Sequence, residues 1–326
     1  MEAERLTVAI VTRDRPLALR RLLGSLVRAG GRALAKVVIV DDSSDPKDPR
    51  QEFRTLPVDY VPIPGRVFIS KAKNLALARV PSELVCFIDD DNLVPEDGLS
   101  TLTQDMRTDT RLGGLMPSVV YARRPDLVWV YACPFRPGRW DFNLIGRNRS
   151  RDPAWEGRFL PTDALPNAGI FRTDALHPLG GFEERLPVNS SAELCFRLKQ
   201  AGHSVFADSR VLFWHDVDPP GVPGYWAQHA TDPERVYHEM GDWLLFRRAL
   251  HPELPPADWR FAYHALPFLL GVTVGLAVRG RRPFLPPLVA LARGYRRGIR
   301  DAPLSVRRGT GEDRGGKRSD SVTDSG

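Results

Sequence analysis

The chain has 326 residues, of which 42% are hydrophobic and 26% are charged, and its formal net charge is +6. This is an ordinary globular composition, with ample length for a sizeable core. The three cysteines, Cys86, Cys133 and Cys195, include no CxxC pair, which argues against a disulfide framework or a cysteine zinc site and fits a reducing compartment.

Short apolar runs alternate with helical patterns over the first 90 residues. We expect strands at residues 6–11, 37–40, 58–61 and 84–88, one helix opened by Pro16 and another capped by Ser70. This alternation predicts an α/β fold with a mostly parallel sheet and helices on both faces. Two of the strands end in acids, Asp41-Asp42 and Asp89-Asp90-Asp91, and ligands of such sheets bind at the carboxyl ends of strands.

The middle of the chain loses this periodicity. Residues 134–166 are rich in Pro, Arg, Trp and Asn and are expected to form a long loop, whose aromatic side chains argue against full disorder. Further on, we expect a strand at 168–172, a helix at 192–201 and a last strand at 211–214, directly before His215.

The C-terminal third is apolar and basic. Residues 261–278 contain His264 and no acid, Lys or Arg, and a shorter apolar run covers 283–292, with arginines after each. Eighteen helical residues span roughly 27 Å, which is marginal for a bilayer core. The pattern favours a membrane-seated hairpin or interfacial helices over 261–300, and the alternative is a helical pair packed on the core.

Three regions follow from this organisation. We expect a nucleotide-binding domain over 1–220, a C-terminal helical and membrane-associating extension over 221–300, and a disordered tail over 301–326. The N-terminus lacks the zones of a signal peptide, so the protein is expected in the cytoplasm, at the inner face of the cell membrane.

The segment Phe87–Asn92, FIDDDN, contains three adjacent aspartates. Three adjacent carboxylates repel one another unless a cation joins them, and oxygen ligands select hard ions such as Mg2+ or Mn2+. A lone run of three Asp residues could equally be a helix cap or a turn.

Several blocks, taken in order, resemble the family 2 glycosyltransferases of the GT-A fold. They are VAIVTRDRP (8–16), VIVDDSSD (38–45), SKAKNLAL (70–77) and FIDDDN (87–92), followed by FRTDALHPLGGFEERL (171–186), FRLKQAGHSV (196–205) and VLFWH (211–215). The resemblance covers residues 6–216, about two thirds of the chain, and implies a GT-A type nucleotide-binding fold with a C-terminal helical extension.

The resemblance also implies roles for individual residues. Asp91, Asp89 and His215 would bind a divalent metal, Mn2+ or Mg2+, although His215 beside Trp214 could be a core residue. The nucleotide-sugar donor, carrying UDP, GDP or dTDP, would meet these side chains: Thr12, Arg13, Asp41, Asp42, Lys71, Asn74, Asp89 and Asp90. For Lys71, plain solvation is an equally good interpretation.

The catalytic base departs from the family pattern. The family has a Glu-Asp pair where this chain has Ser190-Ser191, and a serine cannot deprotonate a sugar hydroxyl unaided. Glu193 is the nearest carboxylate and our candidate base, with Asp163 and Asp216 as further candidates. The loop Gly180–Glu184 would flank the acceptor, and three arginines of the long loop would meet an acceptor phosphate: Arg147, Arg149 and Arg151.

Together these expectations describe a metal-dependent transferase that moves a hexosyl or deoxyhexosyl group by a single inverting displacement. The acceptor would be a lipid-linked or cell-envelope glycan at the membrane surface, and no nucleic acid partner is expected. Two alternatives stay open. One is a catalytically weak or inactive sugar-binding scaffold, favoured by the missing Glu-Asp pair. The other is a sugar-phosphate nucleotidyltransferase, disfavoured because the loop at residues 12–16 has no glycine.

Overall fold

A ten-stranded sheet forms the centre of the molecule. The computed structural model describes residues 6–30, 34–136, 141–221, 233–250, 285–301 and 304. Along the main path the strand order is β10-β12-β6-β11-β4-β1-β2-β3, with β5 paired to β12 and β7 paired to β6. The pairings β12/β6, β4/β1, β1/β2 and β2/β3 are parallel, so most of the sheet runs in one direction, as expected.

The strands occupy the following ranges. The sheet contains β1 (Thr7–Thr12), β2 (Lys36–Asp41), β3 (Val58–Pro62), β4 (Leu84–Asp89), β5 (Asn92–Leu93), β6 (Leu112–Tyr121), β7 (Arg124–Val130), β10 (Phe159–Pro161), β11 (Ala168–Arg172) and β12 (Ser204–His215). Two short strands, β8 (Phe135–Arg136) and β9 (Asp141–Phe142), form a separate ribbon.

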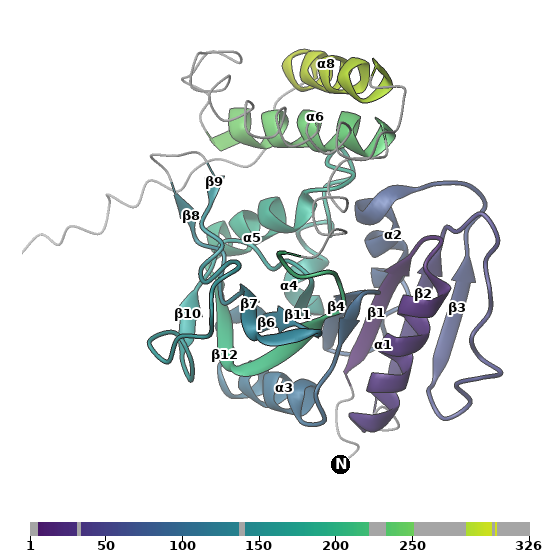
Figure 1. The fold of residues 1–326 in the computed structure, drawn as a ribbon, viewed down its shortest axis with the longest axis vertical. Coiled ribbons are helices and arrows are strands. Elements are labelled where there is room, and N and C mark those ends of the chain that lie inside the picture. The colour runs from purple at the N-terminus through teal and green to yellow at the C-terminus, as the bar shows by residue number, and fades with distance from the viewer. Residues whose placement is uncertain are drawn as a thin grey trace, which may run out of the picture.

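Helices cover both faces of the sheet. Figure 1 shows α1 (Pro16–Arg28) in front of β1 and β2 and α2 (Phe68–Leu77) behind them. At the other end of the sheet, α3 (Gly98–Thr108) lies on one face, with α4 (Thr173–Leu176) and α5 (Ser190–Gln200) on the opposite face. Strands β1, β2 and β4 are almost fully buried, which explains their continuous apolar runs.

Most of the expected elements are present, with three differences. First, α2 begins at Phe68, so Ser70 is not its cap but a buried residue whose hydroxyl shares a hydrogen bond of 2.7 Å with the Ser190 hydroxyl. Second, the last strand covers Ser204–His215 and not only 211–214. Third, the long loop contributes β8, β9 and β10, and the last of these pairs with β12.

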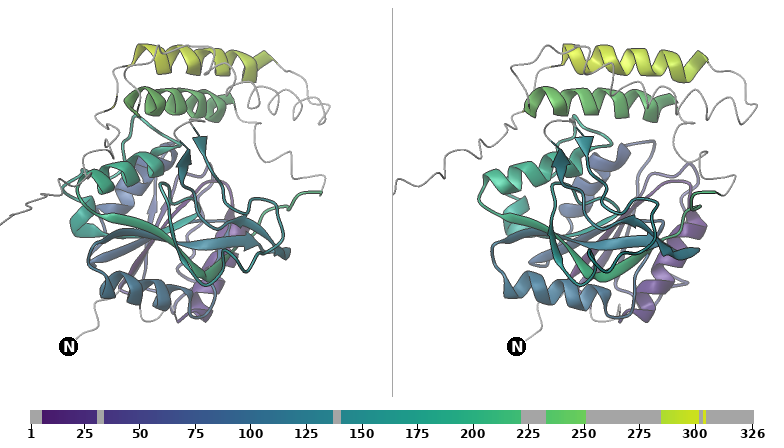
Figure 2. Two further views of the ribbon diagram at one scale, coloured as in Figure 1. Left: turned by 90° about the vertical axis from the view of Figure 1, so that its left-hand side faces the viewer. Right: turned by 60° about the vertical axis from the view of Figure 1, so that its left-hand side comes forward.

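Two C-terminal helices, α6 (Pro233–Leu250) and α8 (Leu285–Arg300), stack as a pair over one end of the sheet domain, with α8 outermost (Figure 2). Glycines allow their close approach, because a Cβ atom on Gly294 would overlap the Tyr237 carbonyl group. The inner helix is part of the main core: the Phe246 ring lies 5.5 Å from that of Phe196 and 6.2 Å from that of Phe142. Four α6 side chains join the apolar cluster of the sheet, namely Leu245, Phe246, Ala249 and Leu250.

The membrane expectation concerns mainly residues outside the described parts. The run 261–278 and almost all of the 301–326 tail lie outside the described residues, whereas most of the 283–292 run lies in α8, which packs on α6. In the part of the chain that the structure describes, no helix has the length and apolar character needed to span a bilayer.

Candidate active site

The acids that end β2 and β4 meet at one edge of the sheet. Strand β1 lies between the two, and its residues Thr12 and Val11 pair in register with Asp41 and Asp89. Neighbouring strands are about 4.8 Å apart, so the two acid-bearing strand ends are separated by roughly 10 Å. The Thr12 hydroxyl donates to Asp90 Oδ2 at 2.7 Å and thereby joins the end of β1 to the second acid cluster.

The first acid pair is buried and holds its own loops. Asp41 accepts hydrogen bonds from the Tyr60 hydroxyl at 2.7 Å and from the Ser43 amide at 2.9 Å. Asp42 accepts from the Val67 amide at 2.9 Å, directly before α2. Arg13 donates to the carbonyl oxygen of Asp42 at 2.5 Å. These contacts hold the loops around Asp41 and Asp42, the two acids that we expect to meet the nucleotide-sugar donor.

Asp91 lies between two basic groups. Its Oδ1 is 3.3 Å from His215 Nε2, and its Oδ2 accepts from Arg15 Nη1 at 2.7 Å. Burial alone would raise the pKa of Asp91, but the hydrogen bonds and charges of His215 and Arg15 lower it below its usual range. Burial raises the pKa of the neighbouring Asp90 to about 6, although Arg15 also reaches this group, at 3.2 Å.

On α2, the cation near the acids is Lys73. Its Nζ atom lies 3.8 Å from Asp89 Oδ1, whereas Lys71 is exposed. The Asn74 side chain donates to the Phe182 carbonyl at 2.9 Å and accepts from the Phe182 amide at 2.8 Å. In this arrangement Asn74 fastens the 180–184 loop to α2, and the nucleotide contact that we expected for it stays a prediction.

The ring of Trp129 packs edge-on against His215, with centroids 5.1 Å apart, and the Arg147 guanidinium lies 4.3 Å from the centre of the Trp129 ring. Of the three loop arginines, Arg147 is therefore the one connected to the Asp91–His215 pair. Arg151 instead pairs with Glu156 at 2.6 Å, and Arg149 is exposed.

All three candidate bases are ion-paired. Glu193 is 1% exposed, and its two carboxylate oxygens accept from Arg197 at 2.6 and 2.7 Å. Asp163 pairs with Lys199 at 2.5 Å, and Asp216 pairs with Arg21. Arg197 also donates to the carbonyl groups of Leu179 and Gly181, so the Glu193–Arg197 pair ties α5 to the 180–184 loop.

The start of α5 has a carboxylate, but it comes from α6. Asp242 is fully buried and accepts from the amides of Val188 at 2.8 Å and Asn189 at 3.1 Å. Its other oxygen accepts from Arg297 of α8 at 3.1 Å. Burial raises the pKa of Asp242 to about 6, although these hydrogen bonds and Arg297 favour the ionised form.

This arrangement predicts a pH-dependent contribution to stability. The folded chain holds the Asp242 proton more tightly than the unfolded chain, whose value is 3.8. The contribution is therefore fully present below pH 4 and is lost as the pH rises to about 6. Between pH 4 and pH 7, the unfolding free energy of the wild type should fall relative to that of Asp242→Asn by on the order of 2 to 3 kcal/mol. Urea denaturation of both proteins across this range measures the difference, and parallel curves would contradict the prediction.

Comparison with known proteins finds a family whose model matches the part of the chain that holds the acids at the ends of β2 and β4. A family model described as "Glycosyl transferase family 2" matches residues 7–152. These residues form a family 2 glycosyltransferase domain. The matched range holds the Asp41, Asp42 and Asp89–Asp91 acids, and it ends within the long loop. The structure adds β10 to β12 and α5 to the same sheet domain.

Curated relatives support the family 2 domain. Pre-mycofactocin glycosyltransferases of two Mycobacterium tuberculosis strains are 25% identical over 217 residues, which is 64% of this chain and 42% of each relative. The chain thus spans about two fifths of the length of these curated relatives.

Solved structures similar to the chain show the GT-A fold. Residues 1–349 of TarS from S. aureus match with a TM-score of 0.53 and 16% identity over 91% of this chain and 81% of that chain. The Pyrobaculum calidifontis mannosyltransferase PcManGT, in complex with GDP-Man and Mn2+, matches with a TM-score of 0.52 and 18% identity. This match covers 90% of this chain and 83% of that chain. GalNAc-T7 with UDP, GalNAc and Mn2+ matches with a TM-score of 0.55 and 13% identity. The match covers 85% of this chain and 58% of that chain.

Three residues beside the acids of the family 2 domain were missed at the sequence level. Arg15 contacts both Asp90 and Asp91, Lys73 faces Asp89, and Trp129 packs on His215. A basic residue three positions after Thr12, in the loop at the strand end, was a usable signal for Arg15. The sequence held no comparable signal for Trp129. Strand β7 was not expected, and His215, on which Trp129 packs, is 86 positions away in the sequence (215 − 129).

Proposed function

We propose that the chain transfers a sugar from a nucleotide-diphosphate sugar to an acceptor hydroxyl in one inverting displacement assisted by a divalent cation. One observation carries the proposal: the acids that end β2 and β4 share one edge of the sheet in a family 2 domain. A lipid-linked or cell-envelope glycan is the proposed acceptor. PcManGT and GalNAc-T7, which share the fold, were solved with a nucleotide or nucleotide sugar and Mn2+.

The side chains present fit such a cation. Asp91 and His215 bring a carboxylate oxygen and an imidazole nitrogen to 3.3 Å, and Mn2+ accepts both types of ligand. Among the described residues, no three His, Cys, Asp or Glu side chains are grouped so as to hold an ion, and Asp89 faces Lys73. We therefore propose two protein ligands, with the remaining positions left to diphosphate and water, as is common for cations at phosphate sites.

The protein groups have distinct roles in the proposed step. Bound at Asp91 and His215, the cation would neutralise charge on the departing diphosphate. Lys73, beside Asp89, would add a positive charge on the same side. Thr12 and Arg13 would position the nucleotide against Asp41 and Asp42 at the edge of the sheet. Most of the rate would then come from positioning and charge stabilisation.

A donor screen tests the proposal. Melting temperatures are measured with UDP, GDP and dTDP and their sugars, with and without Mn2+, because a bound ligand stabilises the folded state by mass action. We expect one nucleotide to raise the melting temperature, and Mn2+ to increase that rise. The preferred donor is then tested for release of nucleoside diphosphate. If no nucleotide stabilises the chain, the proposal fails.

Arg15 makes a further prediction about the cation. Its guanidinium contacts Asp90 and Asp91 and so supplies positive charge to carboxylates that would face the metal. Replacing it by Gln should raise the affinity for Mn2+ without nucleotide by roughly threefold to tenfold, since a competing charge is removed. Isothermal titration measures this affinity. Arg20→Gln is the matched control, because Arg20 lies on α1, five residues after Arg15, but pairs with Glu52. Equal affinities in the two variants would contradict the prediction.

A second function, that of a sugar-binding scaffold, is favoured by one observation. The Ser190 hydroxyl at the start of α5 is buried against Ser70, where the family has its Glu-Asp pair. A scaffold would show the same nucleotide-dependent rise in melting temperature, yet would release no nucleoside diphosphate in the presence of acceptor extracts. Turnover therefore separates the two functions.

A further inference from the structure

The arginines of α8 differ from most arginines of the sheet domain. At the domain surface, arginines commonly pair with a nearby acid, as in Arg50–Asp48, Arg111–Asp109 and Arg124–Asp126. Helix α8 contains four arginines and no acid between Leu285 and Arg300. Within the described parts of the chain, no ion pair involves the three exposed ones, Arg293, Arg296 and Arg300. Their charge is thus directed to solvent or to a partner.

These three arginines lie on one face of the helix. At 100° per residue, positions 293, 296 and 300 fall within about 60° of one another, and position 289 falls inside the same sector. Val289 is 46% exposed there, while Leu291, Gly294 and Gly298 face α6. The outer face therefore has a small apolar end followed by a basic end. We call Val289, Arg293, Arg296 and Arg300 the outer face of α8.

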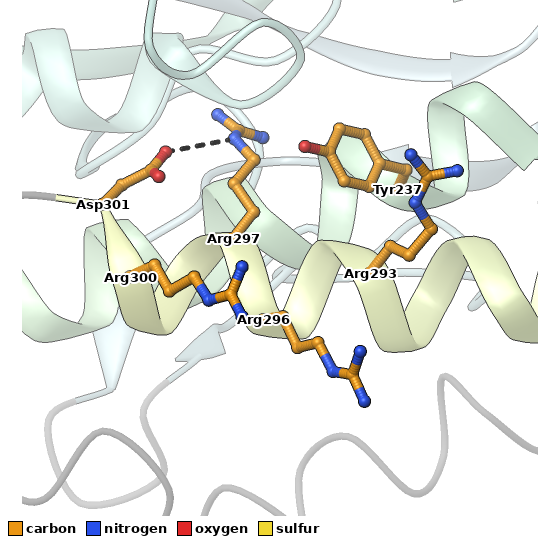
Figure 3. Close-up of a pocket in the computed structure, with 6 residues that line it drawn as sticks. All are labelled: Tyr237, Arg293, Arg296, Arg297, Arg300 and Asp301. Atoms are coloured by element: carbon orange, nitrogen blue, oxygen red, sulfur yellow. Dashed lines mark ion pairs between the residues drawn. The ribbon is translucent and has the colours of Figure 1, made fainter.

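A hollow of about 350 Å³ adjoins this face. It is lined by Tyr237 of α6 and by the arginines at 293, 296, 297 and 300, with Asp301 at the end (Figure 3). Arg297 is held on the inner side by Asp242 and by Asp301, and its guanidinium lies 5.7 Å from the centre of the Tyr237 ring. The pairing of Arg297 fixes the rotation of α8 and so keeps the other three arginines outward.

We propose that the outer face of α8 binds an anionic phospholipid surface. The arginines contact headgroup phosphates and Val289 enters the headgroup boundary, as for an interfacial helix with a basic polar side. Because α8 is the outermost of the described helices, this face meets a flat surface before the described part of the sheet domain does (Figure 2). The inference deepens the proposed function, because a lipid-linked acceptor would lie at such a surface.

Vesicle binding by the full-length chain tests the proposal. Sedimentation measures partitioning onto vesicles of phosphatidylcholine alone and of phosphatidylcholine with phosphatidylglycerol. We expect binding only to the anionic vesicles. The triple variant Arg293→Gln, Arg296→Gln and Arg300→Gln should weaken the partition coefficient by on the order of a hundredfold. The separate variant Val289→Asp should weaken it by roughly tenfold.

The matched control removes the same charge elsewhere. Arg50→Gln, Arg111→Gln and Arg124→Gln together should bind vesicles within about threefold of the wild type, because these arginines are already paired. The proposal is overturned if the wild type does not bind anionic vesicles, if the α8 variant binds as well as the control, or if inorganic phosphate at millimolar concentration abolishes binding, which would indicate a site for a free anion.

Nucleotide-dependent melting is measured on the same samples. If it persists while vesicle binding is absent, the α8 inference fails and the proposed function stands. The reverse result would reject the proposed function alone.

Discussion

Replacing Asp91 by Asn is expected to reduce sugar transfer by about a thousandfold or more. Asp91 follows the end of the central strand β4, contacts His215 at 3.3 Å and is the carboxylate that we assign to the cation. An amide of the same shape keeps the fold but removes the charge. We expect nucleoside diphosphate release to fall, Mn2+ binding to be lost, and the melting temperature without ligands to change little.

The control for this variant is Asp109→Asn. Asp109 is also paired with an arginine, Arg111, but it precedes β6 and so lies at the opposite edge of the sheet. Its activity should stay within twofold of the wild type. If Asp91→Asn retained full metal-dependent turnover, the cation site would have to be sought elsewhere and the assignment of Asp91 would be wrong.

Replacing Arg197 by Met is expected to lower the unfolding free energy by about 3 to 5 kcal/mol. The substitution leaves the Glu193 carboxylate, which is 1% exposed, without its partner and removes the donor to the carbonyl groups of Leu179 and Gly181. Urea denaturation measures the loss. The control is Arg235→Met on α6, whose pairing with Glu239 has the same helical spacing but is more exposed, and which should cost less than about 1 kcal/mol.

The same pair decides the role of Glu193. If the carboxylate is structural, as its contacts indicate, Glu193→Gln should destabilise the fold, while turnover per folded molecule stays within about threefold of the wild type. A thousandfold loss of turnover in a protein of normal stability would instead identify Glu193 as the base and overturn the structural interpretation.

The N-terminal half of the sheet was predictable because its strands are buried on both faces. Residues 37–40 and 84–88, for example, form continuous apolar runs between clear turn signals. The segment from Asn92 to Val130 was not expected, because β6 contains Gly113 and Gly114 and β7 begins with exposed polar residues. The register that pairs β6 with β12 joins positions about 90 residues apart and leaves no local pattern.

For the candidate site, too, local patterns were predictive and contacts between distant side chains were not. The acids at the ends of β2 and β4 were predicted to share one edge of the sheet, and they do, because topology alone brings such strand ends together. Their roles toward the nucleotide and the metal stay predictions. Side-chain pairing could not be predicted in the same way. Glu193 has an arginine one helical turn away, and the spacing alone did not decide between a free base and an ion pair. The contact of Asp242 with the start of α5 could not be predicted, because Asp242 lies on a helix that follows about 50 residues later.

The insertion of α6 into the core has a consequence for the order in which the chain is made. The Phe142 and Phe196 rings emerge from the ribosome well before Phe246, which covers them. Until then the nascent sheet presents a bare aromatic surface, and α5 starts without its carboxylate. Chains released early, for instance at residue 220, should therefore stick to one another and be recovered from inclusion bodies. An element that is translated after the strands thus completes the core of the sheet domain.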